Sequence, residues 1–477
     1  MKKTISNIFY NCCTQLLAII VPLITSPYIS RVLQPDRLGV YTYIDSVSQI
    51  VLVIGSIGLS NYAIREISYV KDNRRERSII FFEILILRII LLVVSYIAYC
   101  LFMKNTRYEM FSIYQLIWFF GSFLDIAWLF NGVEDFKTIV LRTFFVKVIN
   151  VILIFIFIKT RDDLLLYIII MSICQVINSL LCYGNIKKLI MLPDFKDLHI
   201  IRHIKPTLKI ALPQIVTLIY YQMDKVMLEF LLKDTATIAY YDQADKIVKI
   251  PVTAITAVST VMLPKSSKYY IDDDKRGLEK SIQMTIDFSI LLIMPMCFGL
   301  MSISYGFVPW FYGSDYLMVA PIIIALCPVI IARGLSSISN TQYLVPTKNT
   351  KYLTLSSVFS AFANVIINYL TIPLFGVYGA VLGTIVAEYS VTAIQFYYMM
   401  KNIKIHNLFR NVIKYSFYGL IISVVSLYIW TLMGTHIYTT ILQIVVACLL
   451  YLVMLAITKD KLIFRHIKCR NGEYNEE

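Results

Sequence analysis

The sequence predicts an all-α, polytopic membrane protein with about fourteen transmembrane helices, and two observations predict it. The chain of 477 residues is 58% hydrophobic with a mean hydropathy of +0.70, and only 16% of its residues are charged, against roughly 25% in soluble globular proteins. Apolar stretches also recur along the whole chain. Most are close to the about 20 residues that cross ~30 Å of hydrocarbon, and longer than the about ten-residue strands of a membrane barrel.

The predicted spans follow one another with short connections. They are 11–33, 40–66, 79–103, 111–131, 138–158, 163–184, 207–232, 243–266, 284–308, 318–340, 351–373, 377–400, 411–433 and 436–457. The chain begins with Met1-Lys2-Lys3, as a signal peptide does. The apolar run that follows is too long for one and contains Pro22 and Arg31, so we expect a retained first helix.

The formal net charge of +14 reflects membrane orientation and not nucleic-acid binding. Lys and Arg occur in short clusters between the apolar stretches, and do not follow one soluble face. If the N-terminus is cytoplasmic, the cytoplasmic segments contain 27 Lys and Arg and the outer segments contain six. This excess follows the positive-inside rule and predicts that both termini are cytoplasmic.

The chain divides into two six-helix halves and two further helices. The longest internal loop, 185–206, is amphipathic and basic, as expected of a segment that lies at the membrane interface. We predict an N-terminal lobe at 1–206, a C-terminal lobe at 207–400, and two final helices with a basic tail at 401–477. Each half opens with a proline-containing helix, and paired interrupted helices often mark the binding site of a transporter.

Several charged side chains fall inside the predicted spans, where each costs at least ~2.5 kcal/mol unless it pairs, reaches the interface or faces water. Arg88, Lys147 and Arg333 lie about two turns or more from either end of their spans, without an acid three or four residues away. Their partners must come from another helix or from a ligand. We predict that they face a water-filled cavity, and Asn150 extends the polar stripe of Lys147.

Other cations have a simpler alternative. Arg65 and Arg142 lie near helix ends and can reach the interface. Because Arg65 and Glu66 are adjacent, we expect them to point in different directions and not to pair. Arg31 lies about one turn from the outer end of its helix, on the same face as Tyr28, and either reaches the interface or faces a cavity.

Two further groups can neutralise themselves. Lys225 has Glu229 four residues away as an available partner. Lys246 and Lys249 share one helix face with Asp242. That stripe either lines the outer mouth of a cavity or satisfies its own charges.

Among the fewer acids, Glu388 near the middle of its span is the best candidate for a proton or sodium-ion site, with Asp45 and Asp224 as further candidates. The alternative for Glu388 is a buried carboxylate bonded to a serine or tyrosine. We expect no other cofactor and no metal site, because eight of the nine cysteines lie in or beside apolar spans without zinc-ligand spacing.

Longer stretches carry a resemblance to a known family. They are NxxxQ at Asn11 and Gln15, PYISRVLQPDRLGVYTY at 27–43, GLSNYAIREIS at 58–68, ALPQIVTLIYYQMDKVMLEFL at 211–231, AYYDQADKIVKIP at 239–251 and VMLPKSS at 261–267. Together they resemble the polysaccharide-exporter branch of the multidrug/oligosaccharidyl-lipid/polysaccharide (MOP) flippase superfamily, and Wzx-type flippases of lipid-linked repeat units within it.

This resemblance implies a MATE-like fold with two pseudo-symmetric six-helix lobes around a central cavity. It implies alternating access that moves undecaprenyl-diphosphate-linked oligosaccharide to the outer leaflet of the bacterial cell membrane, for capsule, exopolysaccharide or O-antigen. By residue type and depth, the cationic cavity of the family corresponds to Arg31, Arg88, Lys147, Lys225 and Arg333. The expected partners are the anionic lipid-linked glycan and the bilayer, with polymerase and export machinery as candidates. A monomer is expected to function.

Three alternatives remain open from the sequence. A lipid II flippase has a hallmark cluster of arginines in its first helices, where this chain has only Arg31 and Arg65. A multidrug cation exporter has twelve helices and an acid-rich site, whereas Asp45 stands alone here. A membrane enzyme needs a catalytic carboxylate pair or a large outer loop, and the acidic run at 272–274 reads as a solvated turn.

Overall fold

The computed structural model describes residues 2–56 and 58–460, which form α-helices joined by short turns, and no strand occurs in these two ranges. Contacts within the chain divide it into two compact units, residues 1–239 (unit 1) and 240–477 (unit 2). The predicted lobe boundaries stay predictions. The basic tail from 461 onward and the side chains of Asn11 and Gln15 lie outside the described residues.

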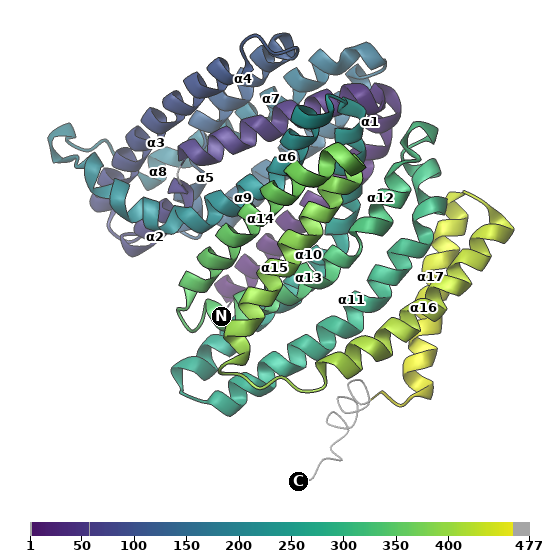
Figure 1. Cartoon of the computed structure of the whole chain (residues 1–477). Coiled ribbons are helices and arrows are strands. Elements are labelled where there is room, and N and C mark those ends of the chain that lie inside the picture. Colours follow the sequence, from purple (N-terminus) through teal and green to yellow (C-terminus); the bar gives the residue numbers. More distant parts are fainter. Residues whose placement is uncertain (1, 57, 461–477) are drawn as a thin grey trace. The chain divides into compact units, whose positions relative to one another are not determined.

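Unit 1 contains nine α-helices within its described residues. They are α1 (Lys2–Ser56), α2 (Leu59–Tyr69), α3 (Arg74–Met103), α4 (Glu109–Phe123), α5 (Ala127–Gly132), α6 (Phe136–Phe157), α7 (Leu164–Leu180), α8 (Ile186–Leu189) and α9 (Ile204–Leu232). α1 packs against α3, α6 and α9, and α4 packs against α7. Figure 1 shows α3, α4 and α7 in the blue part of the chain.

The longest helix, α1, is broken in its middle. At about 1.5 Å per residue, its 55 residues would measure roughly 80 Å, more than twice the thickness of the hydrocarbon. The break is at Gln34, whose φ is 61° and ψ is 168°. Pro35 follows, and a proline disfavours helical backbone in the residue before it. The break therefore falls one residue after the predicted end of the first span.

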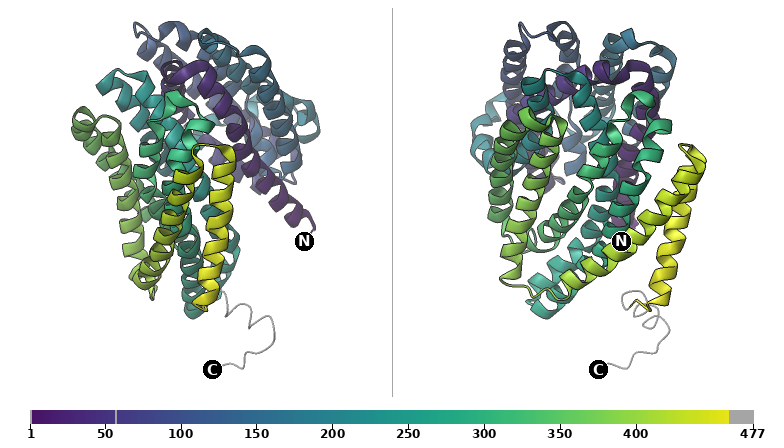
Figure 2. Two further views of the ribbon diagram at one scale, coloured as in Figure 1. Left: turned by 90° about the vertical axis from the view of Figure 1, so that its right-hand side faces the viewer. Right: turned by 45° about the vertical axis from the view of Figure 1, so that its right-hand side comes forward.

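The helices that lie in unit 2, or enter it from residue 235, make up the rest of the described chain. They are α10 (Thr235–Ile271), α11 (Lys275–Phe311), α12 (Val319–Leu326), α13 (Pro328–Ile338), α14 (Thr350–Phe375), α15 (Val377–Met400), α16 (Leu408–Met433) and α17 (Ile437–Ile457), with a π-helical turn at Ser339–Leu344. α14 pairs with α15, and α16 pairs with α11 and α17. Figure 2 shows α16 and α17 side by side in yellow.

The all-α, multi-pass membrane fold is confirmed. Among the described residues, eleven helices are long and apolar enough to cross a membrane, or twelve if the bent pair α12 and α13 forms one span. All fourteen predicted ranges coincide with helical segments. Three of them are interrupted, which hydropathy did not predict: 40–66 by Gly58 at φ 62°, 111–131 around Asp125, and 318–340 before α13.

Candidate functional site

Two buried arginines of unit 1 share one carboxylate. Arg88 on α3 is 5% exposed and Arg142 on α6 is 7% exposed. Nη2 of Arg88 lies 3.5 Å from a carboxylate oxygen of Asp125, and Nη2 of Arg142 lies 4.0 Å from the other. Asp125 occupies the break between α4 and α5, where it also accepts a hydrogen bond from the backbone of Ala127. This group, the arginine pair, has two positive charges and one negative charge.

Further hydrogen bonds fix the arginine pair. Arg88 donates to Oγ of Ser60 at 3.2 Å and to the carbonyl of Ser122 at 3.1 Å. Arg142 donates to the carbonyl of Asn178 on α7 at 2.7 Å. The Nε atoms of both arginines are buried and have no hydrogen-bond partner in the described part of the chain. The sequence suggested that Arg142 reaches the membrane interface. Instead, its side chain is buried and donates to a residue of α7.

A second polar group joins α1 to α9. Gln49 donates to Asp45 at 2.6 Å and accepts from Gln222 at 2.7 Å. Oε1 of Gln222 accepts in turn from Ser46 at 3.2 Å and from Lys225 at 3.3 Å. Asp45 and Lys225, which the sequence suggested for separate roles, therefore lie in one chain of hydrogen bonds.

The two acids of α9 are buried. Asp224 is 3% exposed and Glu229 is 7% exposed. Glu229, which the sequence offered as an available partner of Lys225, is bound by Arg107 and by the hydroxyl of Tyr108 at 2.7 Å. The carboxylate of Glu229 therefore ties α9 to the connection between α3 and α4.

Lys147 on α6 differs from the other intramembrane cations. It is half-buried, and within residues 2–56 and 58–460 no hydrogen bond or ion pair involves it. Asn150, the next polar residue of its stripe, is buried, and its amide nitrogen lies 3.3 Å from the sulfur of Met171 on α7. The charge of Lys147 therefore has no counterion in the described protein.

Three predicted residues lie toward the surface of unit 1. The hydroxyl of Tyr28 donates to the carbonyl of Ile158 at 2.6 Å, and Arg31 is exposed. Arg65 is also exposed and binds the adjacent Glu66, with Nη2 2.8 Å from Oε1. The expectation that these neighbours do not pair was wrong, because the long guanidinium arm bends back along the helix surface.

In unit 2, Arg333 lies between two carboxylates. It is on α13 and 7% exposed. Its Nε lies 2.6 Å from Glu388 on α15, and its Nη1 lies 3.3 Å from Asp245 on α10. Lys249 binds the other oxygen of Asp245 at 2.5 Å. This group, the Arg333 network, contains two positive and two negative charges.

The lysine stripe of α10 binds its own acids. Lys246 lies 2.6 Å from Asp242, and Lys249 binds Asp245 in the same i, i+4 arrangement. Both lysine side chains are more than 40% exposed, while both acids are buried. Among the described residues, no three His, Cys, Asp or Glu side chains gather as metal ligands would.

The predicted cations belong to separate groups. Arg88 lies with Asp125, Lys225 lies in the chain that reaches Asp45, and Arg333 lies in the other unit. Sequence reasoning missed Arg142, because its position near a helix end suggested the interface. It also missed that an acid in a helix break, Asp125, serves cations of two other helices.

Comparisons with known proteins show the family and the fold of this chain. The sequence model of the family described as "Polysaccharide biosynthesis protein" matches residues 4–270. A protein of Shigella dysenteriae named as a candidate O-antigen transporter is 22% identical over 391 residues, which cover 80% of this chain and 96% of that protein.

Solved structures show the same fold. The lipid II flippase MurJ in an inward closed conformation matches with a TM-score of 0.69 at 18% identity, over 96% of this chain and 100% of that one. An inward-facing multidrug resistance transporter of the MATE family, in the MOP superfamily, matches with a TM-score of 0.63 at 15% identity, over 81% and 94%. The predicted MOP fold is confirmed.

Proposed function

Because this chain belongs to the polysaccharide biosynthesis protein family, we propose that it is a flippase for a lipid-linked glycan. Its cargo is an undecaprenyl-diphosphate-linked oligosaccharide repeat unit, which alternating access moves from the cytoplasmic to the outer leaflet of the bacterial cell membrane. The glycan then enters a capsule, an exopolysaccharide or an O-antigen. The relative named as a candidate O-antigen transporter supports this assignment. The cargo crosses without covalent change, so no residue is assigned a catalytic role.

The observation that carries this proposal is the local surplus of positive charge at the arginine pair and at Lys147 of unit 1. Arg88 and Arg142 share the single carboxylate of Asp125, and each keeps a buried Nε–H group without a partner in the described structure. Lys147 adds a charge with no counterion among those residues. A guanidinium group matches the oxygens of a diphosphate through its fork of donors. A cation exporter would need the opposite surplus.

The roles of the remaining predicted residues follow from charge. Cations attract the diphosphate, and we assign this role to Arg31, Arg88, Lys147, Lys225 and Arg333. Acids inside the spans take up a coupling proton or sodium ion, for which Glu388, Asp45 and Asp224 are the candidates. Tyr28, Arg65, Asn150, Lys246 and Lys249 are secondary candidates for the substrate path.

Complementation tests the proposed function. A bacterial strain that lacks its own repeat-unit flippase receives the wild-type gene, the Lys147→Ala variant or the Lys137→Ala variant. We expect the wild type to restore surface polysaccharide. Lys147→Ala should lower it strongly, because the loss of one charge-assisted contact weakens binding by roughly tenfold or more. Lys137, exposed at the start of α6, is the matched control and should be replaceable.

Surface polysaccharide is measured by glycan staining, and protein in the membrane by immunoblotting. Full export by the Lys147→Ala variant would show that the charge of Lys147 is not needed to bind the diphosphate. If the wild-type protein is folded in the membrane yet gives no rescue, but rescues a strain depleted of its lipid II flippase, the function is lipid II transport instead.

A further inference from the structure

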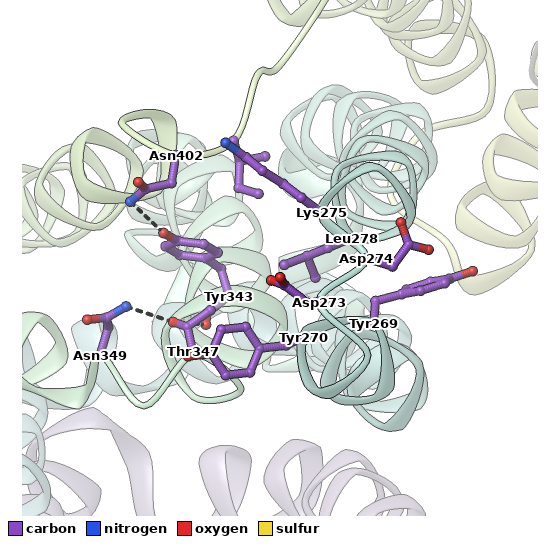
Figure 3. Close-up of a pocket in the computed structure, with 11 residues that line it drawn as sticks. Tyr269, Tyr270, Asp273, Asp274, Lys275, Leu278, Tyr343, Thr347, Asn349 and Asn402 are labelled. Atoms are coloured by element: carbon purple, nitrogen blue, oxygen red, sulfur yellow. Dashed lines mark hydrogen bonds between the residues drawn. The ribbon is translucent and has the colours of Figure 1, made fainter.

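A pocket of about 330 Å³ opens at one end of unit 2 (Figure 3). All of its lining residues come from 267–280, 341–351 and 401–414, the segments that the charge distribution assigns to the cytoplasmic side. Its volume is at the lower end of the about 300–1,000 Å³ of small-molecule sites. The pocket therefore has room for a small ligand on the side where a flippase takes up its cargo.

One wall of the pocket presents hydroxyl and amide groups. The hydroxyl of Tyr343 accepts a hydrogen bond from the amide of Asn402 at 2.8 Å, and the amide of Asn349 donates to the hydroxyl of Thr347 at 2.9 Å. Figure 3 marks both bonds as dashed lines. Each amide has a second N–H and a carbonyl oxygen beyond these bonds. The wall can therefore hydrogen-bond several neighbouring hydroxyl groups.

The opposite wall is the turn between α10 and α11. Asp274 caps α11 by accepting from the backbone of Gly277 at 2.8 Å, and the acidic run 272–274 is exposed, as expected of a solvated turn. Asp273 and Asp274 are both exposed, and both line the pocket. Leu278 and Ile403, only 5% and 2% exposed, add an apolar surface between the walls.

The chemistry of these walls selects a class of ligand. Adjacent hydroxyls above an apolar C–H face are the features of a sugar ring, and such a face packs against the electron-rich face of an aromatic side chain. Tyr270, which is 44% exposed and lines the pocket, offers that surface. Among the lining residues, Asp273 and Asp274 outnumber Lys275, so the lining itself has no surplus of positive charge to bind a phosphate or a carboxylate.

We propose that this pocket binds a neutral sugar ring of the glycan as the substrate is loaded. The proposal rests on the flippase function proposed above and adds a subsite for the headgroup. The arginine pair and Lys147 of unit 1 carry a local positive surplus that suits the diphosphate, whereas this pocket of unit 2 carries hydroxyl, amide and carboxylate groups that suit sugar hydroxyls.

Binding of free sugars to the purified full chain in lipid nanodiscs tests the pocket. Saturation-transfer NMR is recorded with a panel of neutral hexoses, 6-deoxyhexoses and N-acetylhexosamines, and with inorganic pyrophosphate as the anionic comparison. We expect at least one neutral sugar to bind. Tyr270→Ala and Asn402→Ala should each weaken it by about fivefold, the effect of one ordinary hydrogen bond or ring contact. Pyrophosphate should not compete with it.

Matched controls lie in the same unit. Asp272→Asn changes an exposed acid beside the pocket, and Tyr369→Ala removes a 63% exposed tyrosine of α14 that does not line it. Both should bind sugar as the wild type does. Because Tyr270 is itself exposed, its replacement should leave the fold intact, and elution of each variant as a single species checks this.

Any of three outcomes would contradict the proposed sugar site. They are no binding of any sugar of the panel, binding to the Tyr270→Ala and Asn402→Ala variants as tight as to the wild type, or displacement of the sugar by pyrophosphate. If one of these outcomes occurs while the gene still restores surface polysaccharide, the proposed sugar site is wrong and the proposed flippase function is unaffected. Sugar binding by a protein that restores no polysaccharide would support the pocket and count against the flippase function.

Discussion

At the scale of single residues, the two buried charge groups differ in their balance. The Arg333 network contains as many acids as bases, so its members satisfy one another. The arginine pair of unit 1 has one carboxylate for two guanidinium groups. Removing one member of a buried ion pair typically costs ~3–5 kcal/mol, whereas replacing both with apolar residues is often neutral. A single alanine at Arg333 would therefore mix an effect on folding with an effect on transport.

Replacing Arg333 and Glu388 together separates these effects. Arg333→Ala alone should lower the yield of folded protein, because two buried acids lose their shared cation. In Arg333→Met with Glu388→Leu, one charge of each sign disappears and Asp245 keeps Lys249. We expect this double variant to regain near wild-type yield by size-exclusion chromatography, while surface polysaccharide stays absent.

The control for this pair of variants is Lys280→Ala, an exposed lysine of α11, which should change neither yield nor export. Recovery of export together with yield in the double variant would show that Arg333 and Glu388 serve only the fold.

At the scale of elements, the hairpin of α14 and α15 depends on glycine. Gly379 and Gly383 have the small-xxx-small spacing that lets membrane helices approach closely. A Cβ added at Gly379 would lie 2.4 Å from the backbone nitrogen of Ile372, and one at Gly383 would lie 1.9 Å from Oδ1 of Asn368. The carbonyl of Gly379 also accepts a hydrogen bond from Thr371 at 3.0 Å. Hydropathy predicts both helices but not how closely they pack.

Gly379→Ala should destabilise the protein. Its new methyl group would meet backbone atoms of Thr371 and Ile372, which cannot move aside as a flexible side chain would. Overpacking of this kind typically costs ~1–3 kcal/mol. The measurement is the midpoint of thermal unfolding in detergent, which should fall by several degrees.

Gly299→Ala is the matched control, because Gly299 is also inside a helix of unit 2 and an added Cβ meets nothing within 4 Å. Alanine there should be neutral or stabilising, since glycine in a helix costs roughly 0.5–1 kcal/mol relative to alanine. Equal midpoints for the two variants would contradict the close approach of α14 and α15.

At the scale of the whole molecule, the sequence predicted the spans better than it predicted the site. An apolar run long enough to cross the bilayer is a local property, so all fourteen ranges fall on helices. Hydropathy alone does not predict where a helix breaks. Pro35 indicates the bend at Gln34, but the bend at Asp125 depends on backbone hydrogen bonding that composition does not show.

The partners of buried charges depend on which helices are neighbours, and sequence periodicity does not contain that information. Arg333 finds Glu388 across 55 positions of the chain, and Arg88 finds Asp125 in a helix break. Depth alone correctly indicated that Arg88 and Arg333 need partners outside their own helices. It could not distinguish a balanced network from a surplus of charge.

The distribution of basic residues predicts the orientation of the whole chain in the membrane. With 27 Lys and Arg in one set of connecting segments and six in the other, the positive-inside rule places both ends of the chain in the cytoplasm. Fusions of green fluorescent protein to each end should fluoresce, and alkaline phosphatase fused after Gly434, in an expected outer loop, should be active. Active phosphatase at the C-terminus would reverse the orientation. The sugar pocket of unit 2 would then open at the outer face, where it would serve release of the glycan and not its uptake.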